Sequence, residues 1–136
     1  MSTTLLCATV TATSMAELRR RRDQVAGADL VELRLDGIGD LDVSAALEGR
    51  RLPVIVTCRP TWQGGRHDGD EAARVAVLER AWDLGAEWVD VEDGAADAFV
   101  ARVRGRRIVR SYHDFDGVPA DLEARFRHLL ASGAEE

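Results

Sequence analysis

Short apolar runs alternate along the chain with longer stretches whose apolar residues recur at helical spacing. The runs are rich in β-branched residues and predict strands; they cover Leu5–Val10, Leu30–Asp36, Pro53–Cys58, Trp88–Glu92 and Arg107–Tyr112. Because each run is followed by a helical stretch, the pattern predicts a parallel sheet with right-handed crossovers.

The helices are marked by their ends as well as by their spacing. Ser14 and Glu17 form a capping-box pattern at the start of the first helix. A helix over residues 71–84 has an apolar stripe of Val75, Leu78 and Trp82. Pro119 is predicted to open the last helix, whose stripe is Leu122, Phe126, Leu129 and Leu130. Weaker patterns predict helices over Asp42–Leu47 and Ala95–Val103.

Charged and polar residues close four of the predicted strands, at 32–36, 57–59, 90–92 and 111–114. Functional groups at successive carboxyl ends are typical of a (β/α)8 barrel, whereas an open sheet gathers them at one switch point. No Gly-x-Gly-x-x-Gly follows a strand. We therefore predict an α/β protein of the TIM-barrel class. A full barrel takes roughly 250 residues, so residues 1–136 would form one domain of about five β/α units, with the remaining strands after Glu136.

Composition narrows the class of protein. Apolar residues make up 46% of the chain, charged residues 31%, and the net charge is −6, which indicates a globular protein. Basic residues are spread out, and the run Arg19–Arg22 is expected to be a solvated helix face, so no nucleic acid partner is predicted. All 18 basic residues are arginine.

Cys7 and Cys58 lie in apolar runs and are expected to be buried free thiols. Neither a signal peptide nor a membrane span is predicted, and the cytoplasm is the expected location.

Two strand ends suggest ligand contacts. Glu32, Arg34 and Asp36 alternate onto one strand face, and opposite charges there must be paired or bound to a polar ligand to offset desolvation. Arg59 follows the third strand at the start of a loop containing Pro60 and the pair Gly64-Gly65. Its planar guanidinium would suit a carboxylate.

The later strand ends add possible acid–base groups. Asp90 and Glu92 share a strand face and could form a metal site, a general base with its partner, or acceptors for arginines across the barrel. His113 ends the fifth predicted strand, where a group that titrates near neutrality could transfer protons. His67 in a polar loop and His128 on a helix are not candidates.

In order, Val-Glu-Leu-Arg-Leu-Asp (31–36), Val-Thr-Cys-Arg-Pro (56–60) with Gly-Gly, Val-Asp-Val-Glu (89–92) and Ser-Tyr-His-Asp-Phe (111–115) resemble the type I 3-dehydroquinate dehydratases of the shikimate pathway. The resemblance implies a (β/α)8 barrel and a hydro-lyase reaction without a cofactor or metal. In it a lysine forms a Schiff base with 3-dehydroquinate, and a histidine removes a proton before water leaves. It further implies that His113 is the acid–base catalyst and that Glu32, Arg34 and Arg59 bind substrate hydroxyls and carboxylate. Asp90 and Glu92 would orient these groups.

The chain departs from the family pattern in informative ways. The Schiff-base lysine belongs to the sixth strand, which lies beyond these residues, and the N-terminal amine is the one amine in the chain. Gln63 stands where the family usually has a glutamate that pairs with the histidine. Val118 precedes Pro119 where the family tends to have threonine.

Two alternative functions follow. The first is a non-catalytic remnant or scaffold that binds a quinate-like ligand. The second is a metal-dependent lyase using Asp90, Glu92 and His113, which Arg34 and Arg59 disfavour because they would repel a cation. Because a five-strand sheet leaves two edges open, we also expect a homo-oligomer or a complementary C-terminal fragment.

Overall fold

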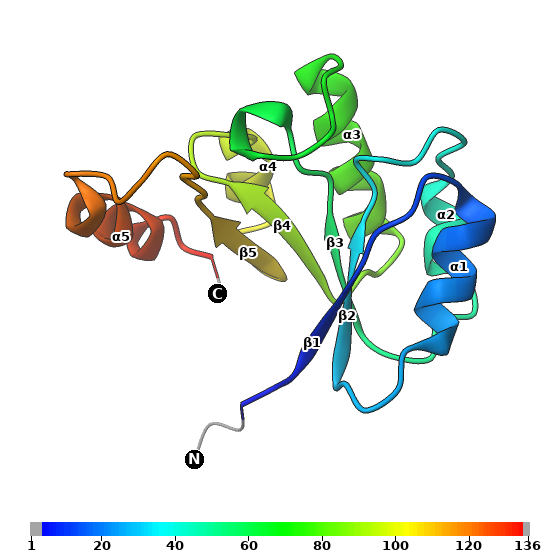
Figure 1. Ribbon diagram of the computed structural model, residues 1–136. Coiled ribbons are helices and arrows are strands. Elements are labelled where there is room, and N and C mark those ends of the chain that lie inside the picture. The colour runs from blue at the N-terminus through cyan, green and yellow to red at the C-terminus, as the bar shows by residue number, and fades with distance from the viewer. Residues whose placement is uncertain (1–3, 135–136) are drawn as a thin grey trace.

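The computed structural model describes residues 4–134, so the N-terminal amine of Met1 lies outside it. Among these residues the strands form one parallel sheet in chain order (Figure 1): β1 Cys7–Val10, β2 Leu30–Arg34, β3 Val54–Thr57, β4 Trp88–Glu92 and β5 Ile108–Ser111. All five predicted strands are confirmed. β4 has the predicted bounds, and the others are shorter because the ladder does not extend over the flanking residues.

Helices follow the strands in the order that the spacing predicts. They are α1 Met15–Gln24, α2 Val43–Leu47, α3 Glu71–Asp83, α4 Asp97–Arg102 and α5 Leu122–Ala131, with a short 3₁₀ turn, η1 Thr61–Gln63. The Ser14 hydroxyl accepts the Glu17 N–H at 3.3 Å, and the Glu17 carboxylate accepts the Thr13 N–H at 3.0 Å. The predicted helix start is therefore confirmed, because both side chains satisfy N–H groups that lack intrahelical partners.

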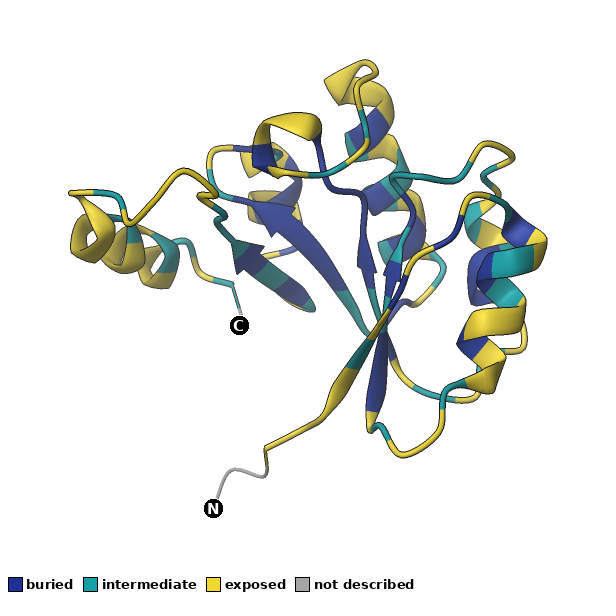
Figure 2. Cartoon of the chain, viewed as in Figure 1, coloured by how far each residue is buried: buried dark blue, intermediate teal, exposed yellow. Residues whose placement is uncertain are grey.

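The core lies between the sheet and helices α1–α4 (Figures 1 and 2). Alternation along β2 buries Val31 and Leu33 against the helices, whereas Glu32 and Arg34 project from the opposite face and are only partly buried. Val54, Val56, Val89, Val91 and Ile108 continue the buried layer across the sheet. The helix-covered face is therefore apolar, and the opposite face carries the polar groups of the strand ends.

The α3 stripe differs from its prediction. The buried residues are Arg74, Leu78 and Ala81, while Val75 and Trp82 are partly buried. The true core face begins one residue earlier than the apolar pattern indicates. An arginine can occupy that position because its charge is fully paired with carboxylates.

Two further expectations about burial are wrong. Cys7 is exposed because it shares with Thr9 and Glu32 the face of the sheet opposite the helices, while Cys58 is buried as predicted. Burial raises the pKa of the Cys58 thiol to about 12. In the arginine run, Arg22 is buried and donates to the carbonyl of Ala46 at 2.6 Å. Helix periodicity turns this one arginine of the run towards α2.

Helix α5 stands beside β5 at the end of the sheet far from α1 (Figure 1). It begins at Leu122, after a turn at residues 120–121, and not at Pro119. None of its residues is buried, and Leu122, Phe126 and Leu130 are 51%, 59% and 67% exposed (Figure 2). Two of its contacts reach the residues just after β4 and β5: His128 Nε2 lies 3.1 Å from Asp93, and Arg125 stacks on Tyr112. Within residues 4–134 no helix has the length and apolarity to cross a bilayer.

Candidate active site

The loop after β3 places Gln63 beside His113. Pro60 leads into η1, and Gly64 ends that turn with a φ of 76°, a conformation that favours glycine. A Cβ on Gly65 would lie 2.0 Å from the Arg59 carbonyl oxygen, and one on Gly64 would lie 2.1 Å from the Phe115 ring. Both positions therefore require glycine, because the loop folds tightly between Arg59 and the segment that follows β5.

His113 is held by one oxygen atom of Gln63. The backbone N–H of His113 donates to Gln63 Oε1 at 2.6 Å, and the ring Nδ1 lies 3.2 Å from the same oxygen. Since this oxygen can only accept, the neutral ring carries its hydrogen on Nδ1. Nε2 is then the basic nitrogen, with its lone pair free to take a proton.

Burial and nearby charge lower the pKa of His113 below its ordinary value of 6.5. Desolvation is the main cause, and the positive charges of Arg59 and Arg34 act in the same direction. Asp90 and Glu32 oppose the shift. The imidazole is therefore neutral at pH 7, which is the state required of a general base.

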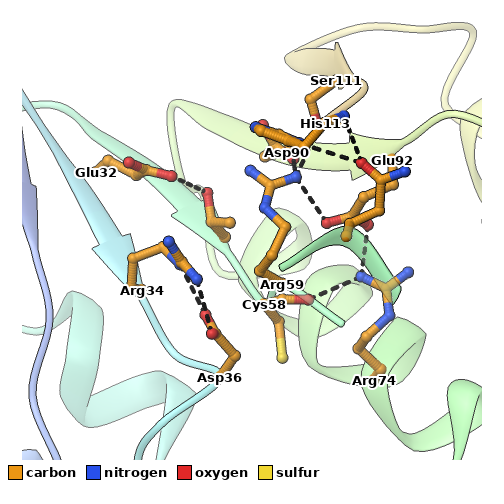
Figure 3. Close-up of polar contacts among 12 residues, drawn as sticks. Glu32, Arg34, Asp36, Cys58, Arg59, Arg74, Asp90, Glu92, Ser111 and His113 are labelled. Carbon is orange, nitrogen blue, oxygen red and sulfur yellow. Dashed lines mark hydrogen bonds and ion pairs between the residues drawn. The ribbon is translucent and has the colours of Figure 1, made fainter. Parts of the chain in front are cut away.

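Arg59 is the centre of a group of charges at the ends of β3, β4 and β5 (Figure 3). Its Nη1 donates to Asp90 and Glu92, each at 2.9 Å, and to the Ser111 hydroxyl at 2.7 Å. Ser111 in turn donates to Asp90 at 2.6 Å. The Nε and Nη2 atoms of Arg59 have no partner among residues 4–134 and are not sealed from solvent. One side of the guanidinium is thus anchored while the other can still donate.

Glu92 is fully buried and joins Arg59 to a second arginine. Its Oε1 accepts from Arg59, and its Oε2 accepts from Arg74 Nη1 at 2.7 Å. Burial raises the pKa of Glu92, and the Arg74 charge opposes that shift. We refer to Arg59, Arg74, Asp90 and Glu92 as the ion cluster. It places a buried carboxylate between two guanidinium groups, the arrangement that best offsets the desolvation of a charge.

Glu32, Arg34 and Asp36 form a second group at the β2 end (Figure 3). Glu32 accepts hydrogen bonds from the hydroxyls of Thr9 at 2.7 Å and Thr57 at 2.8 Å. Arg34 pairs with Asp36 through two hydrogen bonds of 2.8 Å. Burial would raise the pKa of Asp36, but Arg34 outweighs it and the pKa is lowered. Glu32 and Arg34 on β2 therefore do not pair with each other. Glu32 is hydrogen-bonded to two hydroxyls, and the charge of Arg34 is neutralised by Asp36.

The predicted site residues gather at one rim of the sheet. Glu32, Arg34, Arg59 and Asp90 are close enough for their charges to act on His113. A hollow of about 210 Å³ opens between the ends of β1, β2 and the loop after β3, and Arg34 and Asp36 line it. Arg59 and His113 do not line this hollow. A larger hollow, of about 470 Å³, is lined by Trp82 and arginines of the α4–β5 turn, away from these residues.

Two interpretations of Asp90 and Glu92 can now be compared. Both carboxylates accept hydrogen bonds from Arg59, as expected if they are acceptors for arginines across the barrel. Within residues 4–134 no group of three or more His, Cys, Asp or Glu side chains is arranged as a metal site. The geometry favours the role of arginine acceptors.

Sequence reasoning missed two members of this region. Ser111 lies two residues before His113, and strand alternation could have identified it. Arg74 was not predicted to be buried, because a charged residue on a helix is normally expected to face solvent. Its spacing of three from Glu71 and four from Leu78 was the available signal.

A parallel sheet with polar groups at successive strand ends, covered on its other face by helices, defines a protein of the (β/α)8-barrel class. A family model for type I 3-dehydroquinase matches residues 6–135, and the chain belongs to that family.

Relatives and solved structures agree with this assignment. The chain is 40% identical to a 3-dehydroquinate dehydratase of Syntrophobacter fumaroxidans over 121 residues, covering 79% of this chain and 51% of the relative. It is 33% identical over 144 residues to the chloroplastic bifunctional 3-dehydroquinate dehydratase/shikimate dehydrogenase of Arabidopsis thaliana, covering 96% of this chain and 24% of that protein.

The 3-dehydroquinate dehydratase of Geobacillus kaustophilus superimposes with a TM-score of 0.74 at 28% identity, over 96% of this chain and 59% of that structure. The type I enzyme of Clostridium difficile has a TM-score of 0.79 at 18% identity, over the same shares of the two chains. The predicted TIM-barrel class is thus confirmed. The chain spans from a quarter to three fifths of the length of the relatives it matches.

Proposed function

We propose that this chain provides the substrate-binding and proton-transfer part of a 3-dehydroquinate dehydratase site, for the conversion of 3-dehydroquinate to 3-dehydroshikimate and water. The amine for the Schiff base would come from another segment, because residues 1–136 contain no lysine. The family membership and the arrangement around Arg59 support the proposal.

The observation that carries it is the half-used guanidinium of Arg59. Nη1 is anchored to two carboxylates, whereas Nε and Nη2 have no hydrogen-bond partner among residues 4–134. A pair of parallel N–H donors matches the two oxygens of a carboxylate or a pair of hydroxyls. Arg34 would add a second donor group, and Glu32 would accept from a substrate hydroxyl.

His113 would act as the acid–base group through Nε2. Gln63 fixes the tautomer without adding negative charge, so the ring stays neutral and ready to accept a proton. Asp90, Glu92 and Gln63 would support the site by holding Arg59 and His113.

Isothermal titration calorimetry with 3-dehydroquinate tests the binding step. Arg59→Met should weaken binding about 10- to 100-fold, since a charge-assisted hydrogen bond contributes about 1.5–3 kcal/mol. The matched control is Arg20→Met, which removes the same charge from an exposed helix position and should leave affinity unchanged. Equal affinities for the two variants, or no binding to the wild type, would contradict the proposal.

Borohydride reduction in the presence of 3-dehydroquinate tests the origin of the amine. With the 136-residue chain alone, no side chain should form a covalent adduct. Adding a polypeptide that supplies the later strands of a family barrel should restore a lysine adduct on that added polypeptide. Turnover by the 136-residue chain alone would rule out this division of roles.

The free donors of Arg59 would also fit one alternative, a ligand-binding subunit that does no chemistry. In either case we expect the site to be completed by a complementary segment or a second copy. Among residues 4–134, β1 and β5 each have an unpaired edge, and such edges attract further strands.

A further inference from the structure

Arg74 is a fully buried arginine on a helix, and neither the proposed proton transfer nor direct substrate binding requires it. Its side chain is 0% exposed. It lies on α3, on the far side of Glu92 from Arg59 (Figure 3). A structural role alone would be served more simply by apolar residues in place of both Arg74 and Glu92, because such a replacement of a whole buried ion pair often equals or exceeds it in stability. The position therefore calls for an explanation in terms of what the charge does.

The contacts of Arg74 form a rigid clamp. Nε and Nη2 donate to the two oxygens of Glu71, both at 2.8 Å. Nη1 donates to the carbonyl of Cys58 at 2.8 Å and to Glu92 at 2.7 Å. The Cys58 carbonyl belongs to the residue just before Arg59. Arg74 thus holds both the backbone that carries Arg59 and the carboxylate that anchors its side chain.

Charges alternate along this chain of contacts. Glu71 is half exposed at the start of α3, and Arg74, Glu92, Arg59 and Asp90 follow in order towards the rim. Arg74, Glu92 and Arg59 each have opposite charges on both sides. Removal of Arg74 would leave Glu92 with one cationic partner, so Glu92 would draw Arg59 inwards or take up a proton.

We propose that Arg74 is a positioning residue that acts through Glu92 and the Cys58 carbonyl to hold the free edge of Arg59 towards the substrate. This inference rests on the proposed function, because it assigns a use to the free Nε and Nη2 of Arg59. Neutral Glu92 or a retracted Arg59 would misdirect the two donors. Affinity for a carboxylate-bearing substrate would then fall even though Arg74 never touches it.

A double-mutant cycle in the 136-residue chain tests the proposal, with binding of 3-dehydroquinate measured by titration calorimetry. Arg74→Met should weaken binding about tenfold, in the range expected for directly coupled residues. In the Arg59→Met background the same change should cause no further loss. A merely structural role would give the same loss in both backgrounds.

Two milder variants keep the test informative if Arg74→Met folds poorly. Arg74→Lys keeps the charge and can contact Glu92, so it should recover part of the affinity. Glu71→Gln removes charge from the exposed end of the clamp and should weaken binding only about two- to threefold, because Arg74 retains Glu92 and Cys58.

The outcomes separate the two proposals. If Arg59→Met weakens binding but the Arg74 effect is fully additive to it, the positioning role is wrong and the proposed function stands. An affinity for Arg74→Met equal to that of the wild type leads to the same conclusion. If Arg59→Met itself leaves binding unchanged, both proposals are wrong.

Discussion

Helices α3 and α5 are both amphipathic, and at the start of each an acidic residue pairs with an arginine one turn later. The two helices differ in how far these side chains are buried. In α3 the core face includes Leu78 and Arg74, both fully buried. In α5 no residue is buried, and the pair Asp121–Arg125 is accessible to solvent. Of its stripe, Leu122, Phe126 and Leu130 are exposed and Leu129 is partly buried. Periodicity therefore predicts a helix and its apolar face, and the presence of a partner decides whether that face is buried.

The largest expected difference between the two regions concerns their charges. Arg74→Met should lower the free energy of unfolding by about 3–5 kcal/mol, because it leaves a buried carboxylate with half its compensation. Arg125→Met should leave the free energy of unfolding almost unchanged, because a solvent-accessible pair one helical turn apart contributes little. Urea denaturation of both variants measures the difference. Similar values would mean that α5 is more firmly packed than its exposure indicates.

The apolar residues give a second contrast. Leu78→Ala should cost about 2–5 kcal/mol through lost burial and the cavity it leaves. Leu130→Ala, on the exposed stripe of α5, should change stability by less than about 0.5 kcal/mol. Thermal unfolding followed by circular dichroism compares them. A large effect of Leu130→Ala would show that another surface covers the α5 stripe in solution.

A third prediction concerns the seam between α5 and the rest of the molecule. Gly105 has a φ of 67°, and an added Cβ would lie 1.7 Å from the carbonyl oxygen of Gly133. Gly85 has a φ of 81° with open space around it, which makes it the matched control. Gly85→Ala should cost about 1–2 kcal/mol for backbone strain alone. Gly105→Ala should cost more and should also speed amide hydrogen exchange near the end of α5, whereas identical exchange in the two variants would mean that this contact is not maintained.

The smallest expected effect lies at the histidine. Gln63→Glu would place a negative charge beside Nδ1 of His113 and should raise the pKa of the ring above that of the wild type. NMR titration of the ring protons measures the pKa of His113.

In the wild type the pKa of His113 in the folded protein lies below 6.5. The unfolded chain therefore binds a proton first, and stability falls as the pH drops from about 6.5 through the folded-state pKa. That loss should shrink in Gln63→Glu, and an unchanged pKa would refute the role given to Gln63.

Much of the architecture followed from local rules. The strands, the Ser14 cap and the barrel class were predicted correctly because alternation, capping and strand-end chemistry are local signals. Asp90, Glu92 and Arg59 were also placed on one rim, since parallel strands bring their carboxyl ends together.

The remainder depends on tertiary contacts that a single sequence does not display. Arg74 was missed because its burial depends on Glu92, eighteen residues away. The exposure of Cys7 depends on which face of the sheet the helices cover, and no property of its own run reveals that. Pairing across the fold, and not propensity, decides these positions.

The two cysteines differ in their accessibility to thiol reagents, which allows selective labelling of the protein. Cys7 is accessible on the β1 edge, whereas Cys58 lies beneath Arg59 with a thiol that stays protonated at neutral pH. A maleimide dye should therefore attach once to the native protein and twice in denaturant. A fluorophore on Cys7 would then report the arrival of any neighbour at that edge.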